Sequence, residues 1–330
     1  MNNITCNMHV KANGKPCHHY IGSHIENEAG FCKLPTIFRC TEALKEYTPT
    51  LTQSAFKGFV QCPMKYYYQY VLGVQLKNDK LSDAIKGGRI WDKWVGEKVK
   101  NLTLFVNTKI MSTNPVLSAK LTALMRAYES LNIKEDNDGS TQTQISVDMA
   151  GYNVTGYADK TFHNYIQEVK LSGRPDWYTS FENIEFQCGT YLMGNPEWEY
   201  VDLKVTRMPE LKLGKKEELA DYQDRIYSDI VKRPGYYFMG YNMKTRTYGK
   251  RFWRSEFDFD WLMTCYLHMV RNMRFMIDNQ TWTYNPMACN VPAACFYLPI
   301  KRSGGCNLKP NVSPFLFEVK DVNDAKEGML

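Results

Sequence analysis

One stretch of the sequence decides the fold that we expect: GYADKTFHNYIQEVK, residues 156–170. Its alternating pattern indicates two strands joined by a two-residue hairpin turn at His163-Asn164. In such a hairpin Asp159 lies directly opposite Glu168, and the Cβ atoms of cross-strand neighbours are about 4.5–5.5 Å apart. Lys170 shares a face with Glu168 because side chains alternate along a strand. We therefore expect two carboxylates and an ammonium group to converge at one point.

That combination of groups suits a divalent metal ion. Two close carboxylates repel each other unless a cation offsets their charge, and oxygen ligands favour Mg²⁺ or Mn²⁺. Such an ion lowers the pKa of a bound water and neutralises charge on a scissile phosphate. Lys170 would orient the attacking water or stabilise the transition state. The simpler alternative is an exposed hairpin that carries an ordinary Glu–Lys pair, so the surroundings of the stretch have to decide.

The flanking sequence predicts a mixed α/β domain whose central sheet is flanked by helices. Residues 135–140 are expected to form a turn or an exposed loop. Thr52 or Ser54 should cap a first helix and Pro63 should open a second, while Gly87-Gly88 leads into a third. Further helices are expected at 115–131, 181–193, 217–232 and 258–279, and strands at 144–149, 154–162, 165–171 and 200–208.

The order Asp159…Glu168-Val169-Lys170 resembles the catalytic motif of the PD-(D/E)XK nuclease superfamily. A second segment, SAFKGFVQCPMKYYY at residues 54–68, is similar to the first helices of the RecB/AddB-like branch, with their Cys-Pro-x-Lys-Tyr signature. That branch includes the CRISPR adaptation nucleases and phage-type exonucleases.

Two more segments resemble the same branch. Gln187 and Tyr191 are similar to its Q-x-x-x-Y motif, and residues four apart on a helix share a face. The segment GRIWD, residues 88–92, aligns with the branch's glycine-then-histidine helix, but Asp92 stands where the histidine is usual. An aspartate can still bind a hard cation, so Asp92 stays a predicted metal ligand.

The resemblance implies a restriction-endonuclease-like core and the hydrolysis of DNA phosphodiester bonds. It implies an exonuclease acting on DNA ends or single strands, in phage-type recombination, repair or replication. The catalytic residues would be Asp159, Glu168 and Lys170. The metal ligands would be Asp159, Glu168 and the Val169 carbonyl, with Asp92 added. Gln187 and Tyr191 would support the substrate.

Positive charge is concentrated in one segment. Residues 204–254 hold 13 Lys/Arg and 6 Asp/Glu, a net charge of +7, whereas the whole chain carries +6. Together with neighbouring Tyr and Trp residues, this charge suits a phosphate backbone with stacked bases. The alternative is a solvated helix face that carries salt bridges. DNA is the partner that we expect, with a recombinase or a single-strand-binding protein as further possible partners.

The chain has ten cysteines and no export signal, which favours metal ligands or buried thiols over disulfides. Within a Cys/His-rich extension, residues 1–45, a zinc site is predicted at Cys17, His19, Cys32 and Cys40. The alternative is a flexible cysteine-rich tail.

A second cysteine set follows from the resemblance, because several members of the branch hold an iron–sulfur cluster. Cys62 fits the first ligand position, and Cys289, Cys295 and Cys306 would supply the rest. Their spacings of five and ten residues differ from the family's two and five, so we favour free thiols over a cluster.

We therefore predict three parts. They are the extension at 1–45, a nuclease domain at 46–285 with a basic helical region at 204–280, and a C-terminal tail at 286–330 that contains cysteines. No apolar run is long enough to span a bilayer, so we expect no membrane partner and a cytoplasmic location, in the host cytoplasm if the chain is phage-encoded. Two other functions stay open: a non-catalytic DNA-binding protein that keeps the nuclease fold, and a zinc-dependent module that recruits recombination partners.

Overall fold

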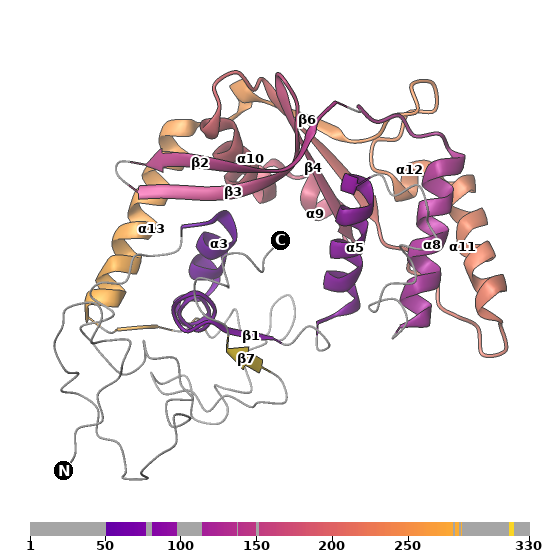
Figure 1. The fold of residues 1–330 in the computed structure, drawn as a ribbon, viewed down its shortest axis with the longest axis horizontal. Coiled ribbons are helices and arrows are strands. Elements are labelled where there is room, and N and C mark those ends of the chain that lie inside the picture. The colour runs from indigo at the N-terminus through magenta and orange to yellow at the C-terminus, as the bar shows by residue number, and fades with distance from the viewer. Residues whose placement is uncertain are drawn as a thin grey trace, which may run out of the picture. The chain divides into compact units, whose positions relative to one another are not determined.

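The computed structural model of the protein (Figure 1) describes residues 51–76, 81–97, 114–136, 138–149, 152–279, 281–283, 285 and 317–319. The chain divides into two compact units. One comprises Met1–Lys80 and Thr264–Leu330, and the other comprises Leu81–Met263. The predicted boundaries after residues 45 and 285 adjoin segments outside the described residues, so they stay predictions.

The larger described unit is built on a five-stranded sheet of order β2-β3-β4-β5-β6. β4 and β5 are parallel, and the other neighbouring strands are antiparallel. This mixed sheet confirms the predicted sheet type. The strands are β2 (Ser140–Met149), β3 (Tyr152–Thr161), β4 (Tyr165–Ser172), β5 (Tyr200–Arg207) and β6 (Lys250–Trp253).

Helices flank this sheet, as predicted (Figure 1). A helical layer buries Trp91, Leu121 and Ile226 in one apolar core with Val169 of β4. None of the described helices combines the length and the apolar character needed to cross a membrane. The helices of this unit are α5 (Asp83–Glu97), α8 (Pro115–Ser130), α9 (Asp176–Thr179), α10 (Phe181–Gly194), α11 (Leu219–Lys232), α12 (Pro234–Tyr237), the 3-10 turn η4 (Arg254–Glu256) and the start of α13 (Phe259–Asn279).

The glycine pair has a different role from the predicted one. α5 begins before it, at Asp83, and the Ser82 hydroxyl accepts a hydrogen bond from the Ile85 N–H at 3.4 Å. Gly87 lies inside the helix, where a Cβ atom would approach Met208 Cε to 2.5 Å. Gly87 therefore allows a close approach between helix and chain rather than marking a helix start.

The described part of the other unit confirms both predicted helix starts. The Thr52 hydroxyl accepts the Ala55 N–H at 3.1 Å, so Thr52 rather than Ser54 caps α3 (Gln53–Gln61). Pro63 opens α4 (Pro63–Tyr66), which continues into the π-helix η2 (Tyr67–Val71). β1 (Val74–Leu76) pairs antiparallel with β7 (Phe317–Val319), a strand pair that the pattern did not predict.

Candidate active site

The hairpin of β3 and β4 has the predicted register. Lys160 pairs with Gln167, and the same register continued by one residue sets Asp159 opposite Glu168. At that point the Val169 N–H donates to a side chain instead of to a backbone carbonyl of β3. Its acceptor is Asp159 Oδ2, at 2.7 Å. Asp159 is therefore anchored to β4 at Val169, between its two predicted partners Glu168 and Lys170.

The turn of this hairpin is also the predicted one. The Phe162 N–H donates to the Tyr165 carbonyl at 2.9 Å, which closes a two-residue loop at His163-Asn164. The Phe162 and Tyr165 rings stack with centroids 4.3 Å apart. Trp198 Nε1 donates to the Phe162 carbonyl at 3.2 Å. These contacts hold the turn, and with it the register that brings the carboxylates together.

Glu168 occupies the centre of the site. Its residue surface is 1% exposed, and its Oε1 accepts hydrogen bonds from Lys170 Nζ and, at 2.5 Å, from Gln187 Nε2. Its Oε2 is buried and has no hydrogen-bond partner among the described residues. A buried carboxylate oxygen without a partner is costly, so Oε2 is the atom of this site that lacks a ligand.

Asp92 of α5 completes a cluster of three interacting carboxylates. Burial and the negative charge of Asp159 raise the pKa of Asp92 to about 7, and Asp92 also hydrogen-bonds to Asp159. Burial and Asp159 likewise raise the pKa of Glu168. Burial lowers the pKa of the Lys170 ammonium, but Glu168 and Asp159 outweigh that effect and raise it. Three carboxylates thus surround Lys170, with Lys160 as a further cation acting on Asp92, and burial and mutual repulsion favour the neutral forms of Asp92 and Glu168 unless a cation binds.

The helix α10 supplies Gln187 and Tyr191, four residues apart as predicted. Gln187 Nε2 donates to the Tyr191 hydroxyl at 3.0 Å as well as to Glu168. The Tyr191 hydroxyl in turn donates to the Tyr157 carbonyl at 2.8 Å. A Cβ atom at Gly156 would lie 2.6 Å from the Tyr191 ring, so only glycine leaves room for it. The structure thus brings both residues to the site, while their role towards a substrate stays a prediction.

A buried ion pair beside the site was not predicted. Lys160 Nζ contacts Glu135 Oε2 at 3.0 Å, and the Tyr128 hydroxyl donates to Glu135 Oε1. The side chains of Lys160 and Glu135 are 3% and 12% exposed, so Glu135 is an exception within the predicted turn or exposed loop, where Asp136 and Asp138 are exposed. No local pattern marks this pair, because its partners lie 25 residues apart.

The donor set fits a divalent cation in its chemistry. Carboxylate oxygens, one of them buried without a partner, are the ligands that Mg²⁺ and Mn²⁺ prefer. The arrangement is not a preformed cage, since no described group of three or more His, Cys, Asp or Glu side chains has metal-site spacing. Lys170 and the Val169 N–H occupy oxygens that an ion would otherwise share. Metal binding would therefore require these side chains to rearrange.

The predicted cysteine sites lie largely outside the described residues. This applies to the zinc set Cys17, His19, Cys32 and Cys40, and to Cys289, Cys295 and Cys306 of the iron–sulfur set. Cys62 is described and buried, and its Sγ accepts the Asn285 N–H at 3.4 Å. Both metal sites stay predictions.

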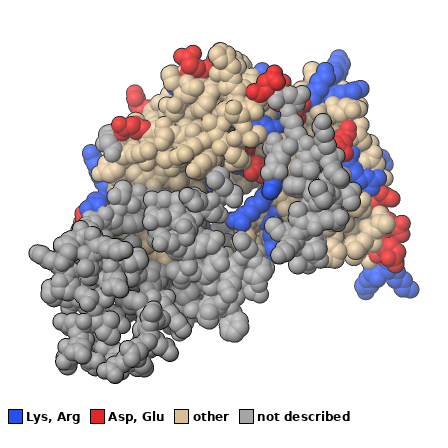
Figure 2. All heavy atoms as spheres, in the orientation of Figure 1, with Lys and Arg blue, Asp and Glu red and all other residues tan. Residues whose placement is uncertain are grey.

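Some of the arginines in the basic segment pair with its own carboxylates. Arg225 pairs with Glu217 at 2.7 Å and Arg233 with Asp229 at 2.5 Å. Figure 2 shows Lys and Arg side chains interspersed with Asp and Glu on the side where Figure 1 shows α8 and α11. Part of the positive charge that suggested a phosphate-binding surface is thus engaged in salt bridges.

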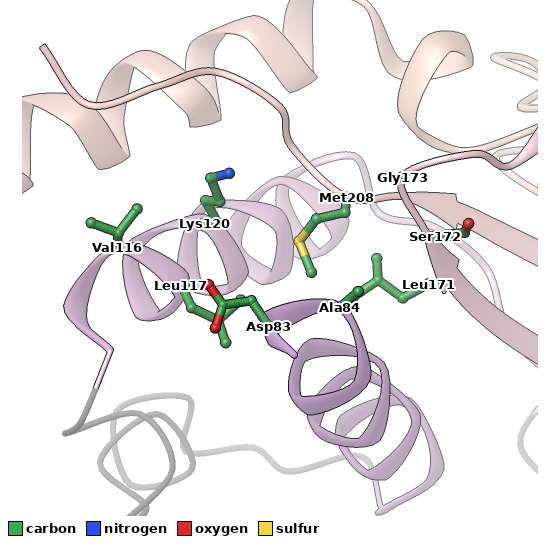
Figure 3. A pocket seen from close by; sticks show the side chains of 9 residues that line it. All are labelled: Asp83, Ala84, Val116, Leu117, Lys120, Leu171, Ser172, Gly173 and Met208. Carbon is green, nitrogen blue, oxygen red and sulfur yellow. The ribbon is translucent and has the colours of Figure 1, made fainter. Parts of the chain in front are cut away.

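A small cavity lies near the site but is not part of it. Figure 3 shows its lining, in which Lys120 and Leu117 of α8 and Asp83 of α5 meet Leu171 of β4. Its volume is about 150 Å³, and none of the predicted site residues lines it. Leu171 alternates with Lys170 along β4, so the cavity opens on the other face of the strand.

Comparisons with known proteins find a similar solved structure, whereas no family model and no curated protein matches the chain. Among solved structures, the chain is similar to a putative exonuclease from Eubacterium rectale. The TM-score is 0.42 at 12% sequence identity, and the similarity covers 82% of this chain and 91% of that one.

Proposed function

We propose that this chain is a metal-dependent DNA nuclease that hydrolyses phosphodiester bonds. The observation that carries the proposal is the convergence of Asp92, Asp159 and Glu168 on one ammonium group, with a buried Glu168 oxygen left unpartnered. An ordinary structural ion pair needs neither the additional carboxylates nor the unpartnered oxygen. The order of the motifs along the chain, which resembles the PD-(D/E)XK superfamily, supports the same function.

Each residue of the site has a distinct role in this proposal. Asp159, Glu168 and the Val169 carbonyl would hold Mg²⁺ or Mn²⁺, with Asp92 as an additional ligand. The bound ion would supply an activated water and neutralise charge on the phosphate. Lys170 stays protonated because neighbouring carboxylates raise its pKa, so it acts as a charged donor to the water or to a phosphate oxygen and not as a base.

Gln187 and Tyr191 act through Glu168. The hydrogen bonds from Gln187 to Glu168 and to Tyr191, and from Tyr191 to the strand carbonyl of Tyr157, fix the orientation of the Glu168 carboxylate. Groups held by such contacts need little reorganisation when they bind an ion or a phosphate. The resemblance implies that Gln187 and Tyr191 also support the substrate, but Tyr191 is buried, so its contribution would be through Gln187 and Glu168.

The finer assignment rests on the resemblance of the motifs. It favours an exonuclease that acts on DNA ends or single strands, in phage-type recombination, repair or replication. A recombinase or a single-strand-binding protein would be a natural partner for such an enzyme.

The test is the degradation of end-labelled single- and double-stranded DNA with Mg²⁺, with Mn²⁺ or with EDTA. We expect cleavage by the wild type with either metal, and a loss on the order of 10²–10³-fold in Glu168→Gln and Lys170→Met. Glu197→Gln is the matched control, since it makes the same change at an exposed turn and should cleave like the wild type. Equal cleavage by all four proteins would refute the assignment of the site.

The main competing function is DNA binding without catalysis. The ammonium of Lys170 already occupies Glu168, and Asp92 replaces the histidine that is usual at its position, so the site differs from an intact metal centre. Retained DNA binding with no cleavage by the wild type in any metal would favour this function. A zinc-dependent recruitment module would involve residues 1–45, which lie outside the described residues.

A further inference from the structure

We infer that a second group of side chains, anchored by Arg207 on the same face of the sheet as Glu168 and Lys170, binds a single strand of DNA beside the proposed catalytic centre. We call this group the arginine–tyrosine strip and define it as Arg207, Tyr236 and Arg233. The inference rests on the proposed nuclease function, whose substrate it makes more specific. It uses contacts that are independent of the carboxylate cluster.

The parallel register of β4 and β5 sets Arg207 on the catalytic face. Lys170 pairs with Val205, and Ser172 pairs with Arg207. Residues paired in this way point to the same face, and so do residues two apart on one strand. Arg207 is therefore one strand across and two residues along from Lys170. The ordinary spacings of a sheet put their Cα atoms about 8 Å apart, so both side chains can reach one short stretch of backbone phosphates.

The Arg207 guanidinium is held in place rather than free to turn. Its Nε donates to the Tyr236 carbonyl at 3.2 Å, and one terminal nitrogen contacts Asp176 at 3.5 Å. Its centre lies 4.4 Å from the centroid of the Tyr236 ring. The side chain is only 13% exposed, and its other terminal nitrogen has no hydrogen-bond partner among the described residues. A fixed guanidinium with an unused donor suits a phosphate oxygen.

Tyr236 adds an aromatic surface next to this cation. Its residue surface is 41% exposed. The bridge between Thr206 and Phe238 attaches its segment to β5. The Arg233 guanidinium lies 4.5 Å from the ring centroid, and its side chain is 47% exposed. Arg233 already donates two hydrogen bonds to Asp229, so it borders the ring while Arg207 is the arginine that can contact the backbone. The exposed part of the Tyr236 ring offers a base a surface for stacking.

These features favour a single strand over a duplex. Stacking on a side chain needs a base whose face is accessible, and the bases of a duplex already stack on each other. Arg207 also lies one strand across from Lys170, so a nucleic-acid strand that contacts Arg207 passes near Lys170. The alternative is that the two arginines merely pack the segment of Tyr236 against the sheet.

A matched control exists elsewhere in the same unit. Arg126 of α8 lies 4.7 Å from the Tyr227 ring centroid and pairs with Asp224 at 2.8 Å. It repeats the chemistry of the strip between α8 and α11, away from Glu168 and Lys170. If lost positive charge alone weakens DNA binding, substitution of Arg126 and substitution of Arg207 should weaken it equally. If the arginine–tyrosine strip binds DNA, only the substitution of Arg207 should weaken it.

The experiment measures the affinity for a fluorescent oligodeoxythymidylate of about 12 nucleotides by anisotropy, with EDTA present to prevent cleavage. We expect Tyr236→Ala and Arg207→Gln each to weaken binding about tenfold, while Tyr236→Phe and Arg126→Gln bind like the wild type. Circular dichroism spectra that match the wild type would show that the variants are folded. Tyr236→Phe keeps the ring and the packing, so it separates stacking from structural damage.

Three outcomes would overturn the inference. These are a wild type that does not bind the oligonucleotide, equal losses in Arg126→Gln and Arg207→Gln, and binding by the strip variants that equals that of the wild type. The cleavage assay separates this failure from a failure of the proposed function. DNA cleavage that depends on Glu168 and is unaffected by the strip variants would refute the strip and leave the nuclease intact.

Discussion

Two buried lysine–carboxylate pairs lie close together in this chain, and they differ in how well their oxygens are satisfied. In the Lys160–Glu135 pair, Lys160 and the Tyr128 hydroxyl each take one Glu135 oxygen. In the Lys170–Glu168 pair, both donors take the same Glu168 oxygen and the other oxygen is left without a partner. The first pair has a partner for each Glu135 oxygen, while the second leaves one Glu168 oxygen without a hydrogen-bond partner among the described residues.

The two ion pairs also differ in the side chains that surround them. Glu168 has two further carboxylates beside it, whereas the Glu135 site has a phenol. Gathering like charges in a buried place costs stability, and proteins accept that cost mainly at functional sites. A buried ion pair is therefore by itself no sign of function. What distinguishes the Lys170–Glu168 pair is the buried Glu168 Oε2, which has no hydrogen-bond partner among the described residues.

Breaking the complete pair should have the largest effect on stability. Lys160→Met leaves Glu135 buried without its cation, so we expect the free energy of unfolding to fall by about 3–5 kcal/mol. Urea denaturation followed by circular dichroism measures this change. Adding Glu135→Gln should restore part of the loss, because the orphaned charge is then removed. A loss below about 1 kcal/mol in the single variant would show that the pair is not a structural element.

Filling the space beneath Tyr191 should have the next largest effect. In Gly156→Ala the new methyl would meet the Tyr191 ring, which then has to move away from the Tyr157 carbonyl. Such overpacking costs about 1–3 kcal/mol, and thermal unfolding would record it. DNA cleavage should fall as well, because Tyr191 supports Gln187. Full activity with normal stability would mean that the ring has no positioning role.

Neutralising the incomplete pair should change stability little. In Glu168→Gln the side chain keeps its shape and can still accept a hydrogen bond from Lys170, and Asp159 still offsets the charge of Lys170. We expect the free energy of unfolding to change by less than about 1 kcal/mol, in the same urea experiment that detects the Lys160→Met loss. A loss as large as that of Lys160→Met would remove the contrast between the two pairs.

The smallest effect should come from the exposed ion pairs of the basic segment. The hydrogen bonds from Arg225 lower the pKa of Glu217 from its usual 4.5 to about 2. Because the folded-state pKa is depressed, the contribution to stability is present above pH 4.5 and is lost as the pH falls towards 2. Unfolding of the wild type and of Glu217→Gln, measured at pH 7 and at pH 2.5, should differ slightly more at pH 7. A larger difference at pH 2.5 would contradict this sign.

The catalytic hairpin could be predicted from the sequence because its determinants are local. The two-residue turn at His163-Asn164 and the period of two determine the register, and the register sets Asp159 opposite Glu168. Gln187 and Tyr191 were identified through the resemblance to the Q-x-x-x-Y motif, and only the helical spacing that sets them on one face is local. Their contacts with Glu168 and with the Tyr157 carbonyl join segments 19 and 34 residues apart, so they could not be predicted from local spacing.

The rest depends on contacts between distant segments. Glu135 and Lys160 are 25 residues apart and meet only in the folded chain, and Arg207 shares a face with Glu168 and Lys170 only through the parallel register of β4 and β5. β6 escaped prediction because Phe252 is its only buried residue, so it shows no clear alternation. The structure also corrected the role of Gly87, because the side chain that approaches it belongs to Met208, far along the chain.

The most direct test of the central claim is the effect of Mn²⁺ on thermal unfolding, which does not depend on cleavage. An ion that binds only the folded protein raises Tm with its concentration. We predict that millimolar Mn²⁺ raises the Tm of the wild type and of Glu197→Gln alike, and leaves the Tm of Glu168→Gln unchanged. An equal rise in all three proteins, or no rise in the wild type, would contradict the claim that the unpartnered oxygen of Glu168 belongs to a metal site.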